Sequence, residues 1–157
     1  DGYVELICGE MLPQAWDCYS GSHFASEATP FFADIFCERN AFTTADAERI
    51  FASAAELGFR LKAHVDQFTN LGGSRLGVEH DAVSIDHLDA ISEEEIAMLA
   101  ASETVGVVIP TENFNGGKMQ FAPARKMIDA GCAVALTTDY NPGSAPCPSQ
   151  PMAMAIA

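Results

Sequence analysis

The sequence predicts an α/β fold in which parallel strands alternate with helices. Five short apolar runs, at 31–36, 59–65, 82–85, 105–109 and 132–137, have the composition of buried strands. These runs begin between 23 and 28 residues apart, and helical patterns lie between them. Such a repeat is typical of βα units, because one parallel strand can follow another only after a long crossover, which is usually a helix.

Two of the intervening segments carry clear signals of a helix start. Residues 45–57 place most of their apolar side chains on one side of a helix, and we expect Thr44 to be its N-cap. Ser92 is the expected N-cap of a helix over 93–101, because Glu95 stands three residues later at the capping-box position.

The rest of the chain divides into helical and polar segments. Helical spacing of apolar residues extends over 3–11, and a further helix is expected over 123–130, ended by Gly131. The polar, serine-rich segment 16–29 and the segment 113–120, which contains two glycines, are predicted to be loops.

Two architectures can hold five βα units of this length. One is a complete doubly wound sandwich of the flavodoxin type. The other is part of an eight-unit (β/α)₈ barrel, for which about 250 residues are typical. The length of 157 residues favours the sandwich, and both architectures remain open until the chemistry is considered.

Composition excludes several classes of partner and site. The net charge of −14 argues against nucleic acid and anionic membranes as partners, because both repel an acidic surface. No apolar run approaches the roughly 20 residues that span a bilayer. The five cysteines are odd in number and scattered without CxxC spacing, which favours free thiols in a reducing cytoplasm over a disulfide framework. Neither a phosphate-binding glycine loop nor a G-x-S-x-G serine motif is present.

Polar residues gather where three of the predicted strands end. His64, His87 and Asp139 each follow an apolar run, and the carboxyl edge of a parallel sheet is where α/β proteins bind ligands. Imidazole and carboxylate are the side chains that bind Zn²⁺ or Fe²⁺, so a metal site is one prediction. The alternative is a structural role, since a single histidine at a strand end is more often hydrogen-bonded than metal-bound.

Four other polar residues lack this combination of position and type. We expect His23 and His80 to be solvated, because His23 lies in the polar segment and His80 lies beside acidic residues at a predicted helix end. We expect Asp66 and Asp86, which flank the two strand-end histidines, to have structural or supporting roles.

Several motifs together resemble the imidazolonepropionase family of the amidohydrolase superfamily. In chain order they are G-E-M-L-P at 9–13, A-D-I-F-C-E at 33–38, K-A-H-V-D-Q-F at 62–68, N-L-G-G at 70–73, S-I-D-H-L at 84–88 and T-T-D-Y-N-P-G-S at 137–144. The combination of H-x-D-Q-F with D-x-N-P-G-S is specific, and the similarity extends over nearly the whole chain. The segment 16–29 fits less well.

The resemblance implies part of a metal-dependent (β/α)₈ TIM barrel, with residues 1–157 as a C-terminal portion that holds about strands 4 to 8. It implies a hydrolase that opens the cyclic amide ring of 4-imidazolone-5-propanoate to N-formimidoyl-L-glutamate in histidine degradation. One divalent metal, Zn or Fe, is implied as the cofactor, with a small-molecule substrate, a cytoplasmic location and a homodimer in the full-length protein.

The resemblance also assigns roles to individual residues. His64 and Asp139 match metal ligands, and Asp139 and His87 match catalytic residues. Gln67 matches a substrate contact that is Glu in some members of the family. The loop residues that match substrate- and product-binding positions are Asn141, Gly143 and Ser144.

The chain departs from the family's pattern in one important respect. The H-x-H pair of the first barrel strand, which supplies two further metal ligands, is absent, as are the upstream Arg, Tyr and His positions and the small β domain. We therefore expect the chain by itself to bind metal weakly and to turn over little substrate. The remaining alternatives are another cyclic-amide amidohydrolase or aminohydrolase, and a non-catalytic α/β module that binds a small molecule.

Overall fold

A computed structural model describes residues 2–157 and contains one parallel sheet of five strands. The strands are β1 (Phe32–Cys37), β2 (Arg60–Val65), β3 (Ser84–His87), β4 (Val105–Val108) and β5 (Val134–Leu136). They lie in the order in which they occur along the chain, and all four pairings are parallel. The predicted strands are confirmed, with starts that differ by no more than two residues.

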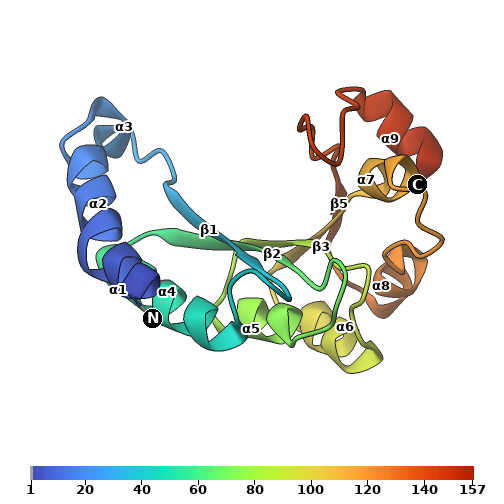
Figure 1. Cartoon of the computed structure of the whole chain (residues 1–157), viewed down its shortest axis with the longest axis horizontal. Helices are drawn as coiled ribbons and strands as arrows, with labels where there is room; N and C mark the ends of the chain where they lie inside the picture. Colours follow the sequence, from blue (N-terminus) through green and yellow to red (C-terminus); the bar gives the residue numbers. More distant parts are fainter. Residues whose placement is uncertain (1) are drawn as a thin grey trace.

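Helices connect consecutive strands, and most of them lie along one side of this sheet (Figure 1). They are α4 (Thr44–Leu57), α5 (Gly73–Glu79), α6 (Glu93–Ala100), α7 (Pro110–Asn115) and α8 (Ala124–Ala130). Figure 1 shows the sheet curving, with α4, α5 and α6 on its convex side and the concave side open. Because right-handed crossovers between sequentially ordered strands all return on the same face, this is the winding of a barrel and not of a doubly wound sandwich.

The hydrophobic core lies between the convex face of the sheet and these helices. Along β2, Leu61, Ala63 and Val65 are buried there, while the alternating residues Lys62 and His64 point to the concave face. Phe32 and Phe36 of β1 are more than one-third exposed, and in a closed barrel this concave face would be the packed interior.

The capping predictions are confirmed at one helix and shifted by one residue at another. Ser92 and Glu95 form the expected capping box of α6. Thr43, not Thr44, caps α4, because Thr43 has the extended backbone of an N-cap and its hydroxyl accepts the amide hydrogen of Asp46. The Asp46 carboxylate in turn accepts the amide hydrogen of Thr43, so that an aspartate stands where a capping box usually has Glu or Gln.

The prediction that 16–29 is a loop was wrong for much of the segment. The chain begins with α1 (Gly2–Leu6), a π-helical stretch η1 (Ile7–Met11), α2 (Leu12–Ser20) and the short α3 (His23–Ser26). Trp16 and Tyr19 hold α2 in place, since their ring centroids lie 5.1 Å from Phe59 and 4.7 Å from Phe31. These partners are distant in sequence, so the local pattern of polar residues did not reveal the packing.

Two further segments complete the description. The predicted loop 113–120 is helical at its start, because α7 extends to Asn115. The chain ends with α9 (Gln150–Ile156), which Figure 1 places beside α7, far from α1. All five cysteines are free, and none of the helices described over 2–157 is long and apolar enough to cross a membrane.

Candidate active site

Two histidines and an aspartate meet where β1, β2 and β3 run side by side. Nδ1 of His64 lies 3.2 Å from Nε2 of His87, and Nε2 of His64 lies 3.2 Å from a carboxylate oxygen of Asp34. The register explains the contact between the histidines, because Val65 is paired with His87 and places His64 beside the end of β3. The structure therefore brings together two of the three strand-end residues predicted from sequence.

The backbone is unusual at the residues that end these strands. Asp66, His87, Leu88 and Asp139 all have positive φ values, of 50°, 83°, 66° and 48°. Residues other than glycine seldom adopt this conformation, and those that do are enriched at active sites and in loops that bind ligands. The strain therefore supports a site at the carboxyl edge of the sheet.

The pKa values of the two histidines shift in opposite directions. The hydrogen bond to Asp34 raises the pKa of His64, against the effect of burial. Burial, together with the nearby positive charges of His64 and Lys118, lowers the pKa of His87 to about 3. At neutral pH, His87 is consequently a neutral imidazole, while His64 holds a proton more readily than a free histidine.

Asp139 stands at the same edge, after β5. It is half-buried, and burial raises the pKa of its carboxyl group, while the positive charge of His64 acts to lower it. The negative charge of Asp139 is in turn one of the influences that raise the pKa of His64. The edge thus holds imidazole and carboxylate groups that act on one another electrostatically.

The loop after Asp139 is organised by Asn141. The Asn141 side-chain oxygen accepts the amide hydrogens of Gly143 and Ser144 at 2.9 and 2.8 Å. Its side-chain amide donates to the main-chain oxygen of Asp139 at 2.8 Å, and Asn115 of α7 donates to the main-chain oxygen of Ser144. In the structure Asn141 therefore holds the loop in shape, and contact of these three residues with a substrate stays a prediction.

Gln67 lies in the loop that follows β2, and it is only 8% exposed. With Phe68, Lys118 and Gln120 it lines a pocket of about 410 Å³ between this loop and the one after α7. Glu38, from the end of β1, holds the first loop in place, because one of its oxygens accepts the amide hydrogens of Phe68 and Thr69 at 2.8 and 3.0 Å. The pocket gives Gln67 access to a small molecule.

Asp34 and Glu38 were not among the site residues predicted from the sequence. Asp34 is the one charged residue in an otherwise apolar strand. A charged residue at such a position is a signal from which a functional role could have been predicted. Glu38 gave a weaker signal, since its partners are backbone amides thirty residues away. Glu112 was also missed; it is 4% exposed and pairs with Lys118 at 2.6 Å.

The expected supporting roles of Asp66 and Asp86 are confirmed. Asp66 is fully buried and accepts hydrogen bonds from the Ser74 amide and hydroxyl, which anchors the start of α5. Asp86 accepts a bond from Ser84 and lies 3.8 Å from the Lys62 ammonium. His23 is exposed as predicted, whereas the prediction for His80 was wrong, since it is partly buried and paired with Glu48 at 2.8 Å.

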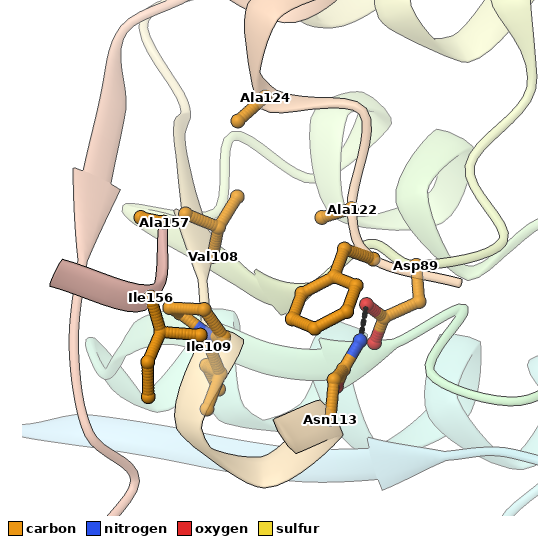
Figure 2. A pocket seen from close by; sticks show the side chains of 10 residues that line it. Asp89, Val108, Ile109, Asn113, Ala122, Ala124, Ile156 and Ala157 are labelled. Carbon is orange, nitrogen blue, oxygen red and sulfur yellow. Dashed lines mark hydrogen bonds between the residues drawn. The ribbon is translucent and has the colours of Figure 1, made fainter. Parts of the chain in front are cut away.

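A second pocket, of about 140 Å³, lies beside β4 and is mainly apolar. Figure 2 shows Val108, Ile109 and Ile156 on one side of it and the Asn113 side chain bonded to Asp89 on the other. Neither His64 nor Asp139 lines this pocket, so it is separate from the group of strand-end residues.

Comparison of sequences identifies relatives that match the whole chain. It is 51% identical over 157 residues to an imidazolonepropionase of Chloroflexus aggregans and 50% identical to one of Herpetosiphon aurantiacus. An imidazolonepropionase of Deinococcus radiodurans is 41% identical over 155 residues. The match covers 37%, 36% and 36% of these relatives, so the chain spans about a third of their length. No protein-family model matches the chain.

Comparison with solved structures finds larger proteins that contain the fold of this chain. A zinc-bound adenosine deaminase of Xanthomonas campestris superposes with a TM-score of 0.59 at 17% identity, covering 82% of this chain and 31% of that one. A guanine deaminase of C. acetobutylicum, solved with guanine bound in its active site, gives a TM-score of 0.58 at 18% identity, covering 74% of this chain and 31% of that one. The chain therefore shares the fold of about a third of each of these two proteins.

Proposed function

We propose that this chain, which is related over its whole length to imidazolonepropionases, supplies the C-terminal part of a metal-dependent hydrolase barrel, about strands 4 to 8. The activity we propose is the opening of the ring of 4-imidazolone-5-propanoate to N-formimidoyl-L-glutamate, the hydrolysis of a cyclic amide C–N bond. The observation that carries the proposal is the contact between His64 and His87 at the sheet edge where Asp139 also stands, within a chain 51% identical to such an enzyme.

The residues at this edge fit one divalent metal ion, Zn²⁺ or Fe²⁺. We propose His64 and Asp139 as its ligands, because imidazole nitrogen and carboxylate oxygen suit either ion. In favour of the fit, two imidazole nitrogens face each other at 3.2 Å beside Asp34. When bound, the ion would supply Lewis acidity, which polarises a carbonyl group and allows water to ionise near neutral pH.

Three residues of the chain would take part in the other steps of the reaction. A carboxylate oxygen of Asp139, whose pKa burial raises, is suited to accept a proton from the attacking water. His87 is a neutral imidazole with a pKa of about 3, and its N–H is suited to donate a hydrogen bond to the oxygen on which charge develops. Gln67 offers both a donor and an acceptor to the amide-like edge of the ring.

The D-x-N-P-G-S loop would hold the other part of the substrate. Asn141 shapes the loop so that Gly143 and Ser144 lie at its turn. We propose that Gly143 lets the backbone approach the ligand and that Ser144 donates a hydrogen bond to it. The proposed ligand is a small molecule, and the free state of all five cysteines is in keeping with a cytoplasmic location.

The test is to join the chain to the N-terminal residues of the Chloroflexus aggregans relative and to follow the loss of absorbance of 4-imidazolone-5-propanoate. Bound metal is measured on the same samples. Asp139→Ala should abolish turnover and the binding of the metal ion held by His64 and Asp139, while Asp129→Ala, an exposed carboxylate on α8, should leave both unchanged.

Three results would contradict the proposal. Turnover that survives Asp139→Ala would remove the role given to that residue. A joined protein that binds metal but leaves the imidazolone intact would favour another cyclic-amide amidohydrolase or an aminohydrolase. Binding of a small molecule without metal would favour the non-catalytic module.

A further inference from the structure

A second group of donor atoms includes a ring nitrogen of His87 and two carboxylates that the site described above does not use. One ring nitrogen of His87, one carboxylate oxygen of Asp89 and one of Glu112 lie within 4.8 Å of one another. His87 and Asp89 come from the end of β3, and Glu112 comes from α7 after β4. Three donors from two neighbouring βα connections therefore converge at the carboxyl edge of the sheet.

All three side chains are buried, with exposures of 3% for His87, 8% for Asp89 and 4% for Glu112. Nε2 of His87 is directed at His64, which leaves Nδ1 as the free ring nitrogen. Within the described residues 2–157, Nδ1 of His87 is a buried polar atom that has no hydrogen-bond partner. Since buried polar atoms are nearly always partnered, an imidazole nitrogen left free beside two carboxylates indicates a missing ligand.

The charges at this place also favour a cation. Two carboxylates are buried there, and Lys118, 2.6 Å from Glu112, offsets only one of them. The amide of Asn113 donates a hydrogen bond to Asp89, as Figure 2 shows, and brings no charge. Burying a carboxylate without a counter-charge is costly, so a bound cation would stabilise this arrangement.

We propose that His87, Asp89 and Glu112 form a second site for a divalent transition-metal ion, bound through Nδ1 of His87 and one oxygen of each carboxylate. One nitrogen and two oxygen donors suit Zn²⁺, Mn²⁺, Fe²⁺ or Co²⁺. This inference rests on the geometry of these three residues and not on the function proposed above.

An ion at this site would have a structural consequence for the first site. Coordination through Nδ1 would leave the proton of the neutral imidazole on Nε2, the nitrogen that faces His64. The ion would also tie α7 to the end of β3. It would thereby select the tautomer of His87 and hold the loop that carries Lys118.

The test uses the purified chain, stripped of metal and titrated with Co²⁺ alone, whose visible spectrum reports nitrogen and oxygen ligands. We expect one equivalent of Co²⁺ that is retained in Asp139→Ala and is bound at least about tenfold more weakly in Asp89→Asn and in Glu112→Gln. Glu103→Gln, an exposed carboxylate on the connection before β4, is the matched control and should bind like the unchanged chain.

A further variant excludes misfolding as the cause of any loss. Lys118→Met removes the ammonium group that competes for Glu112, so the same equivalent of Co²⁺ should bind more tightly. Binding that is unchanged in Asp89→Asn, Glu112→Gln and Lys118→Met would overturn the second site. Co²⁺ that is lost only in Asp139→Ala would also overturn it while supporting the first site, which separates the two proposals.

Discussion

At the scale of single residues, Glu38 determines where the loop after β2 lies. Burial raises the pKa of Glu38, but the hydrogen bonds from the Arg39, Phe68 and Thr69 amides together outweigh it, and the net pKa is lowered. These bonds favour the charged carboxylate and stabilise the folded chain. They also hold the amide of Phe68 in place, and with it the neighbouring residue Gln67. A residue that touches no substrate thus positions one that we expect to do so.

Replacing Glu38 by Gln should lower the free energy of unfolding by about 1 to 3 kcal/mol at neutral pH, since an amide NH₂ would then face backbone donors. A lowered pKa in the folded state means that the stabilisation is present above the ordinary value of 4.5 and is lost as the pH falls through the lower folded value. Urea unfolding should therefore show a difference that shrinks in acid. Glu103→Gln is the control, and a difference that does not change with pH would contradict the role of the charge.

At the scale of the element, helix α5 is held unusually close to the sheet by its glycines. A Cβ built on Gly77 would overlap Cγ2 of Ile85 on β3, and one built on Gly73 would lie 2.7 Å from Cβ of Val65. Both partners are β-branched and buried, so they have little freedom to move aside. This close approach positions the backbone that follows Gln67.

Gly77→Ala should destabilise the chain by roughly 1 to 3 kcal/mol, because overpacking outweighs the helix propensity that alanine adds. Gly9→Ala is the matched control, since Gly9 is also helical and its Cβ would meet no atom within 4 Å. Thermal unfolding followed by circular dichroism would check both variants. A Gly77→Ala variant as stable as Gly9→Ala would show that α5 can shift without cost.

At the scale of the whole molecule, the sheet has two open sides. In the part of the chain that the structure describes, β1 and β5 are the edge strands of the sheet, each with a single neighbour. The concave face also leaves Phe32 and Phe36 more than one-third exposed. Unpaired strand edges next to apolar side chains favour association with another chain.

We therefore expect the chain alone to form oligomers, which light scattering after size exclusion would detect. The double variant Phe32→Lys and Ala135→Lys places a lysine on each edge strand. It should shift the distribution of oligomers towards monomer, because charge on an edge strand opposes pairing. Ala55→Lys, an exposed position on α4, adds charge away from the edges and should have no such effect. A chain that is monomeric at all concentrations tested would contradict this prediction.

The sequence by itself determined the elements whose signals are local. The period of the apolar runs predicted all five strands, and the serine and glutamate of the capping box predicted the start of α6. The histidines and the aspartate at the strand ends could be found because parallel strands bring their carboxyl ends to one edge. The site residues that stand at the ends of strands could therefore be predicted from the sequence alone.

Only the tertiary structure decided the features that depend on partners distant in sequence. Helix α2 exists against a polar local pattern because Trp16 and Tyr19 pack on aromatic rings of later segments. Asp34 meets His64, and Glu38 holds the loop of Gln67, because the pairing of β1 with β2 brings residues about thirty positions apart into contact. Hydrogen bonds and packing depend on distance in space, and the register of the strands sets that distance.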